Sequence, residues 1–208
     1  KPDVGAQGEQ SVVCDPFGGS GDSKHGLKGS LYYFTDNEVA DKNNLPYSGV
    51  ADFFTKGHNA NVDLYMSYLY TPTRAFDSGF ATSDGTILQK SDGTKLFEYF
   101  GIDMKGGIQL TTGATKKKYQ FAVLADDGAK LYITTKSASG AETKNLVVDA
   151  DGDHASLFRV ARAPIELSST DRLKIEMQYY QGPRYHISLI LLWREWNDST
   201  WLDPQDGR

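Results

Sequence analysis

The sequence predicts an all-β fold, a sandwich or barrel of short strands. The chain of 208 residues holds 21 glycines, 12 tyrosines and 10 phenylalanines. Aromatic residues favour strands, whereas glycine favours the turns between them. No stretch of useful length has the spacing of apolar side chains that an amphipathic helix requires. No linker rich in proline or serine divides the chain and no repeat recurs, so we expect a single domain.

Charge and composition exclude several classes of function. A net charge of −5 gives no basic field for nucleic acid or anionic lipid. No run of about 18 apolar residues could cross a membrane, and the first residues lack the apolar segment of a signal peptide. The chain is therefore expected to be a mature form or a fragment of something longer. Cys14 is the only cysteine, so no intramolecular disulfide can form.

The first half of the chain is predicted to open with a lead-in. Residues 1–25 are polar and rich in glycine, with one candidate short strand at residues 10–13. The aromatic cluster within residues 26–34 predicts the opening strand, and residues 37–44 are turn-like. Tyrosines favour a strand over residues 62–70, although the weak alternation there leaves a short helix open.

A loop-rich stretch with two turn signals begins at residue 71 and runs to residue 92. Ser-Asp-Gly-Thr occurs twice, at residues 83–86 and 91–94, on either side of residues 87–90. That spacing predicts a small hairpin. The next strand is predicted at residues 97–104.

The second half supplies the clearest strand patterns. Residues 119–124 alternate with a period of two, and a second run starts at residue 131. Further strands are predicted at residues 145–148, 164–167 and 173–180. One face of the last of these is apolar and is made by Leu173, Ile175, Met177 and Tyr179.

The most apolar run, residues 187–193, predicts a central strand that is covered on both faces. Trp193 stands at its end and is expected in the core rather than at a binding surface. Residues 196–208 are predicted to form a polar tail.

Two adjacent carboxylates, Asp126 and Asp127, lie between strands and are followed by Gly128. Neighbouring carboxylates repel each other unless they are well solvated or a cation neutralises them. A hard cation such as Ca²⁺ takes oxygen ligands that a turn can hold in place. Asp-Asp-Gly is also an ordinary turn sequence, because aspartate bonds to nearby backbone amides and glycine accepts positive φ. The residues alone leave both interpretations open.

A second oxygen-rich turn begins at Gln181. Gly182 and Pro183 make it rigid and direct backbone carbonyl groups outward, and Gln181 adds a side-chain oxygen. If this turn lies beside Asp126 and Asp127, the combined oxygens form a plausible Ca²⁺ shell. The alternative is a plain β-turn in which Arg184 is a surface charge.

An acidic stretch at residues 149–154 resembles the start of an EF-hand loop only superficially. Its glycine is at the fourth loop position instead of the sixth, and the twelfth position is Val160 rather than glutamate. We expect this stretch to form a loop at the rim of the same face. The four histidines have no metal-ligand spacing, and no hydrolase or phosphate-binding motif occurs.

Several stretches together resemble the PA14 domain family over about residues 26–195. They are Gly-Leu-Lys-Gly at residues 26–29, the segment 119–133 around the two aspartates, and the final strands at residues 173–182 and 189–193. The turn Gln-Gly-Pro-Arg-Tyr-His at residues 181–186 is most similar to the lectin-like PA14 modules of large bacterial surface (RTX) adhesins. The insertion at residues 71–95 has no counterpart in this resemblance.

The resemblance implies a β-sandwich or barrel of the jelly-roll type and a Ca²⁺ site. Its metal-ligating residues would be Asp126 and Asp127, joined by a cis peptide bond, together with the Gln181 side chain and the backbone carbonyl groups of Gly182 and Arg184. Two vicinal sugar hydroxyls would complete the shell. Yeast adhesin members have asparagine at the position of Gln181, so their sugar preference does not carry over. Asp151 and His154 are candidates for direct contact with the sugar.

These features predict a calcium-dependent carbohydrate-binding module of a secreted or surface bacterial adhesin, monomeric within a larger chain. Its partners would be cell-surface glycans or monosaccharides, and we expect no enzymatic activity. Two alternatives remain at this stage: a structural or protein-binding PA14 domain, and an accessory module of a glycoside hydrolase.

Overall fold

The computed structural model describes residues 26–82 and 85–197. The predicted lead-in over residues 1–25, with its candidate strand and Cys14, lies outside the described residues. Residues 198–208 of the predicted tail lie outside them as well.

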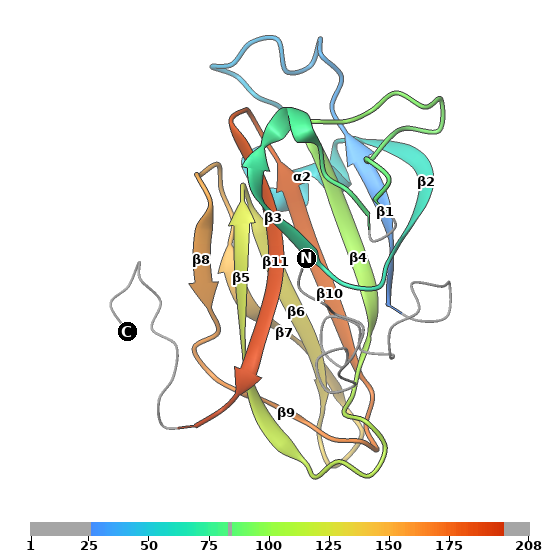
Figure 1. The fold of residues 1–208 in the computed structure, drawn as a ribbon, viewed down its shortest axis with the longest axis vertical. Coiled ribbons are helices and arrows are strands. Elements are labelled where there is room, and N and C mark those ends of the chain that lie inside the picture. The colour runs from blue at the N-terminus through green and yellow to red at the C-terminus, as the bar shows by residue number, and fades with distance from the viewer. Residues whose placement is uncertain (1–25, 83–84, 198–208) are drawn as a thin grey trace.

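Two antiparallel sheets form the two layers of the fold (Figure 1). The first sheet has the strand order β2-β1-β4-β10-β6-β7, and the second has the order β3-β11-β5-β8 with β9 paired to β5. The strands are β1 (Leu27–Tyr33), β2 (His58–Met66), β3 (Tyr70–Ala75), β4 (Phe100–Ile108), β5 (Lys117–Asp126), β6 (Ala129–Lys136), β7 (Glu142–Ala150), β8 (Leu157–Val160), β9 (Ile165–Leu167), β10 (Leu173–Gln181) and β11 (His186–Glu195). This arrangement is the predicted all-β sandwich.

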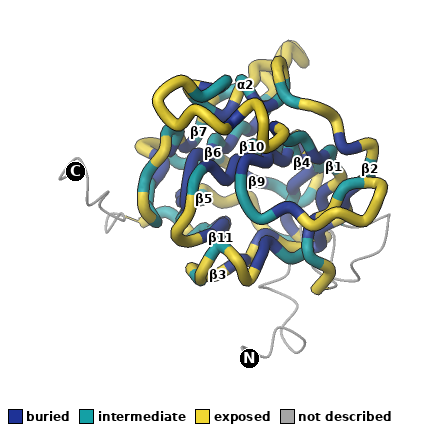
Figure 2. Tube along the Cα trace, turned by 90° about the horizontal axis from the view of Figure 1, so that it is seen from above, coloured by how far each residue is buried: buried dark blue, intermediate teal, exposed yellow. Residues whose placement is uncertain are grey.

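The core lies between the sheets, where Figure 2 shows the buried residues of both layers facing each other. Strand β10 explains how the sequence produces this, because its side chains alternate between the two faces of the first sheet. Leu173, Ile175, Met177 and Tyr179 are at most 6% exposed, whereas Lys174 is exposed. The predicted apolar face is therefore confirmed.

Strand β11 lies between β3 and β5, as a central strand should. Its inward residues Ile187, Leu189 and Leu191 are buried, but Ile190 on the other face is only half-buried. On this outer face Ser188 is fully buried, so the prediction of cover on both faces is wrong only from Ile190 onward. Trp193 is partly buried and packs against the core, as predicted.

The structure corrects the sequence-based element list at three places. Residues 50–55 form a short helix, α2 (Val50–Thr55), although no helix was expected. Six residues are too few to produce a visible helical period, since only Val50 and Phe53 face inward. The predicted insertion contains the edge strand β3, and β8 had not been predicted at all.

The rest of the predicted insertion is a small meander rather than one hairpin. Leu88 donates its backbone N–H to the carbonyl oxygen of Phe80 at 2.9 Å and accepts from the N–H of Leu96 at 2.9 Å. The chain therefore reverses once between Phe80 and Leu88 and once more between Leu88 and Leu96.

A second, smaller core lies beneath the loops at one end of the sandwich. It consists of Phe34, Val39, Tyr47, Val50, Phe53, Tyr99 and Tyr180. The Phe53 ring stacks on the Tyr180 ring with a centroid distance of 4.7 Å. This aromatic cluster joins α2 and the loop before it to the end of β10.

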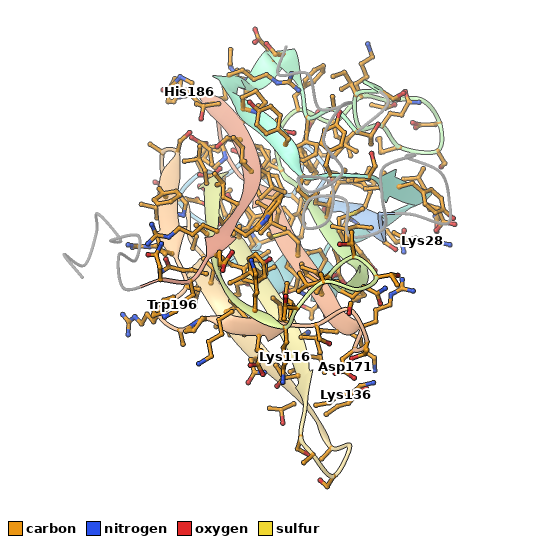
Figure 3. All side chains as sticks on the ribbon, turned by 60° about the horizontal axis from the view of Figure 1, so that its bottom comes forward. Lys28, Lys116, Lys136, Asp171, His186 and Trp196 are labelled. Carbon is orange, nitrogen blue, oxygen red and sulfur yellow. The ribbon has the colours of Figure 1, made fainter. Side chains whose placement is uncertain are left out.

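Figure 3 places His186 at one end of the molecule and Lys116, Lys136 and Asp171 at the other. The first of these ends carries the candidate site described below. No helix in the described part of the chain is long and apolar enough to cross a membrane.

Candidate functional site

Two turns that are far apart in the sequence lie in contact at the end of the sandwich that bears His186. The acidic turn (residues 126–128) joins β5 to β6, and the glutamine turn (residues 181–185) joins β10 to β11. Oδ2 of Asp127 accepts a hydrogen bond of 2.8 Å from the backbone N–H of Gly182. The structure thus brings together the two oxygen-rich turns that the sequence singled out.

Asp126 and Asp127 are joined by a cis peptide bond, as the resemblance implies. Both are nearly buried, at 3% and 4% exposure. Asp126 accepts from the Ser156 hydroxyl through Oδ2 at 3.0 Å. The second oxygen of Asp127, Oδ1, accepts from the backbone N–H of His154 at 2.9 Å.

All the donors to these two carboxylates are electrically neutral. Within the described residues, no lysine or arginine forms an ion pair with either aspartate. Burial, together with the charges of Asp126 and Asp153, raises the pKa of Asp127 to about 7, although the hydrogen bonds from Gly182 and His154 lower it in part. The protein leaves a concentration of negative charge here that a bound cation would neutralise.

Gln181 is fully buried beneath the acidic turn. Its Nε2 donates to the carbonyl oxygen of His186 at 2.8 Å, and its Oε1 lies 2.8 Å from the Tyr179 hydroxyl. The same hydroxyl lies 2.5 Å from the backbone carbonyl oxygen of Asp126. The hydroxyl has one proton, so it donates to only one of these two oxygens at a time. The Asp126 carbonyl oxygen and the Gln181 Oε1 therefore each keep lone pairs for another partner.

Gly182 has no room for a side chain. A Cβ atom there would lie 2.9 Å from the Tyr47 hydroxyl, 3.0 Å from Oδ1 of Asp153 and 3.1 Å from Oδ2 of Asp127. Three oxygens from separate segments therefore surround this α-carbon. Its carbonyl oxygen is 3.4 Å from the backbone N–H of Tyr99, which holds the turn in place.

Arg184 directs its side chain away from this cluster. The guanidinium Nε is 3.4 Å from a Glu98 carboxylate oxygen, and the group lies over the Phe76 ring at 5.4 Å. Any contribution of Arg184 to a metal site would therefore come from its backbone, as the resemblance implies.

The side loop (residues 149–156) forms one wall of the site, and the two predicted sugar-contact residues in it already have protein partners. Asp151 forms an ion pair of 2.7 Å with Lys130 and accepts from the backbone N–H of Val50 at 2.8 Å. The ring nitrogens of His154 are 2.9 Å and 3.0 Å from the carbonyl oxygens of Ala150 and Ala155. Asp151 thus attaches the side loop to β6 and α2, and the His154 ring binds carbonyl groups within the loop itself.

Asp153 is the residue that the sequence reasoning missed. It is exposed, yet its carboxylate accepts from the Tyr180 hydroxyl at 2.8 Å and from the Tyr47 hydroxyl at 3.3 Å. Burial raises the pKa of both tyrosines and the Asp153 carboxylate raises it further, so both hydroxyls stay protonated donors. No local pattern marks Asp153, because Tyr47 and Tyr180 are distant in sequence.

The donor set suits a hard cation that takes oxygen ligands. Among the described residues, no three or more His, Cys, Asp or Glu side chains are grouped so as to hold a metal ion. A cation at this site would therefore need amide and backbone oxygens besides the paired carboxylates. The glutamine turn carries such oxygens, but the groups with which it contacts Asp127 are donors, the Gln181 Nε2 at 3.5 Å and the Gly182 N–H at 2.8 Å.

An open groove continues from this site along the flank between β7 and β8. It has a volume of about 770 Å³ and is lined in part by Lys130, Asp149, His154, Ser156 and Arg159. Ser156 belongs to both the groove and the site, since its hydroxyl binds Asp126. A ligand at the acidic turn would therefore have space to extend over a polar surface.

Comparisons with solved structures show that the fold is PA14-like. A PA14 domain of the MpAFP antifreeze protein superposes with a TM-score of 0.55 and 17% identity, over 84% of each chain. The Epithelial Adhesin 6 A domain from Candida glabrata, crystallised with Galb1-3GlcNAc, superposes with a TM-score of 0.50 and 13% identity, over 88% of this chain and 89% of that chain. No protein-family model and no curated protein matches the sequence.

Proposed function

We propose that this PA14-like domain is a calcium-dependent carbohydrate-binding module of a secreted or surface bacterial adhesin. The observation that carries the proposal is the buried Asp126–Asp127 pair, which is bonded only by neutral donors and touches the glutamine turn. The glycan bound to the similar adhesin domain from Candida glabrata supports the same class of ligand.

In this proposal the two carboxylates, the Gln181 oxygen and the backbone carbonyl groups of Gly182 and Arg184 hold Ca²⁺. When bound, the ion supplies open coordination positions for two vicinal sugar hydroxyls, since Ca²⁺ accepts six to eight oxygens with flexible geometry. Hydrogen bonds from the Ser156 and Tyr179 hydroxyls hold Asp126 in place, so its carboxylate would be oriented for the ion. The rest of the glycan would lie along the groove between β7 and β8.

Affinity per module is expected to be weak. A shallow contact with one or two sugar rings gives dissociation constants from micromolar to millimolar, or about −4 to −8 kcal/mol. Firm attachment to a cell-surface glycan would then come from many modules that act together in a longer chain. The module itself would be monomeric.

Calorimetry with a panel of monosaccharides tests the proposal. Sugar heats are expected in millimolar Ca²⁺ and should vanish with EDTA or in an Asp127→Asn variant. Sugar binding that survives both treatments would contradict the mechanism. Calcium binding without any sugar binding would instead support a structural or protein-binding domain.

We further propose that the domain binds sugar without cleaving it. Incubation with glycans that bind is expected to release no reducing sugar over many hours. Release that depends on this chain would favour the glycoside hydrolase alternative.

A further inference from the structure

Asp153 differs from Asp127, the neighbouring carboxylate of the candidate site, in being exposed. Asp127 is only 4% exposed, whereas Asp153 is open to solvent. Oδ1 of Asp153 and Oδ2 of Asp127 lie 3.0 Å and 3.1 Å from the same point, the position that a Cβ atom on Gly182 would occupy. The two carboxylates therefore border one small space, which any side chain at position 182 would fill.

Two buried tyrosines fix the direction of this exposed carboxylate. The Tyr180 hydroxyl donates to Oδ1 of Asp153 at 2.8 Å, and the Tyr47 hydroxyl donates to Oδ2 at 3.3 Å. The Tyr180 and Tyr47 side chains are 1% and 8% exposed, and their rings pack against the Phe53 ring with centroid distances of 4.7 Å and 4.8 Å. An acidic side chain at a surface normally samples several rotamers, so two anchored donors make this carboxylate a preorganised acceptor.

The Asp153 carboxylate still has capacity for a further donor. Each carboxylate oxygen offers two lone-pair positions, and each oxygen of Asp153 receives one tyrosine hydroxyl. Within the described residues, no lysine or arginine forms an ion pair with Asp153. An exposed and oriented carboxylate is suited to accept a charge-assisted hydrogen bond from a hydroxyl of a bound molecule.

We propose that Asp153 contacts the bound sugar and accepts a hydrogen bond from a hydroxyl that is not one of the two on the calcium ion. This inference rests on the proposed calcium-dependent binding of a sugar. It narrows the ligand class to neutral sugars with a third free hydroxyl, because a site built to bond a hydroxyl strongly disfavours the analogue that lacks it. A sulfate or carboxylate at that position would meet the like charge of Asp153.

Calorimetry in millimolar Ca²⁺ with sugars that lack one hydroxyl each tests this assignment. The probes are the methyl glycosides of glucose, galactose and mannose, and the monodeoxy derivatives of the one that binds most tightly. Loss of either calcium-bound hydroxyl should abolish binding by the wild type and by Asp153→Ala alike. Loss of the hydroxyl that faces Asp153 should weaken wild-type binding about tenfold or more, but should weaken binding by Asp153→Ala less than about twofold.

Variants separate a sugar contact from a purely structural role. Asp153→Ala should lower affinity for the intact methyl glycoside about tenfold, while Ca²⁺ affinity changes less than about fivefold. Asp153→Asn keeps one acceptor oxygen and should recover part of the loss. Tyr47→Phe combined with Tyr180→Phe keeps the charge but frees the carboxylate, so the effect of removing the third hydroxyl should shrink. Asp171→Ala removes the same charge at the opposite end of the molecule (Figure 3) and should change neither affinity.

The outcomes distinguish this inference from the proposed function. If the wild type binds sugar with calcium but every deoxy derivative affects it and Asp153→Ala equally, Asp153 serves only to satisfy the two tyrosine hydroxyls and the inference is wrong. A loss of Ca²⁺ affinity in Asp153→Ala as large as that in Asp127→Asn would also overturn it, since Asp153 would then be a metal ligand. If the wild type binds no sugar in Ca²⁺, the proposed function fails and this inference fails with it.

Discussion

Two acidic segments meet at the same end of the molecule, and the protein neutralises them in different ways. In the side loop, Asp151 has a lysine partner at 2.7 Å. In the acidic turn, Asp127 is more deeply buried but receives only neutral donors, two backbone N–H groups and the Gln181 amide. A buried charge usually has a partner of opposite sign, because desolvation is costly. Asp151 is therefore neutralised within the fold, whereas Asp127 has no charged partner among the described residues, and our proposal assigns the bound cation to it.

The largest expected effect comes from removing the unpaired charge. Asp127→Asn should reduce Ca²⁺ affinity by ~100-fold or more, because a carboxylate ligand is lost. The matched variant Asp151→Asn should change it less than about fivefold. Calorimetric titration of both variants with Ca²⁺ makes the comparison. Similar losses in the two variants would show that the contrast between the segments is mistaken.

Calcium should stabilise the protein strongly. A ligand at 100 times its dissociation constant adds about 2.7 kcal/mol, which raises Tm by roughly 5–10 °C for a domain of this size. Thermal unfolding with Ca²⁺ and with EDTA measures the shift. If calcium leaves the Tm of the wild type unchanged while Asp151→Asn lowers the Tm, both segments serve only to stabilise the fold.

The pH dependence of the calcium-free protein should report on Asp127. Its pKa is raised to about 7 in the folded chain, against about 3.9 for an unfolded aspartate. Between these values the folded state holds a proton that the unfolded state has lost, so this group makes stability fall as pH rises from about 4 to 7. Above pH 7 its contribution is constant. Urea unfolding at several pH values should show a flatter profile for Asp127→Asn than for the wild type.

Calcium affinity should change with pH in the opposite direction. Below about pH 7 a proton competes with the ion for Asp127, so affinity should fall by up to tenfold per pH unit. Asp151→Asn should retain this dependence, since Asp151 is a different carboxylate. Calcium affinity that is constant from pH 5 to 8 would argue against Asp127 as a ligand.

The smallest expected effect on calcium affinity comes from a change in the aromatic cluster. Tyr180→Phe removes the 2.8 Å hydrogen bond to Asp153, and loss of one such bond to a charged group costs about 1.5–3 kcal/mol of stability. Asp153 would remain in place through Tyr47, so calcium affinity should fall only a few-fold. Urea unfolding and calcium titration on the same sample separate the two quantities.

The sequence predicted the sandwich well because its long strands carry their own pattern. The alternation of apolar and polar residues in β10 and the apolar run of β11 can be read from each strand's own residues, without knowledge of the neighbouring strands. Short elements were missed for a physical reason. The helix α2 buries only two side chains, and β3 is an edge strand that pairs with β11, which is distant in sequence. Their stability comes from tertiary contacts, which local propensity does not contain.

The sequence predicted the charged groups of the candidate site but not the residues that hold those groups in place. Adjacent aspartates and a Gln-Gly-Pro turn are conspicuous in a sequence. The bond of Asp151 to the start of α2, and that of Asp153 to Tyr47 and Tyr180, join segments that only the fold brings together. The sequence therefore suggested the ligand groups that we propose, and the structure adds the residues that hold them in place.

Tyr179 gives the site an unusual dependence on the interior. Its ring is packed against Phe80 and Phe100 in the core, while its hydroxyl lies between the Asp126 carbonyl and the Gln181 side chain. A substitution that repacks the core would therefore displace the Tyr179 hydroxyl oxygen at the site. In a lineage of such domains, the loops around the site could diversify freely. Selection on ligand affinity would, however, also act on core residues that pack against the Tyr179 ring.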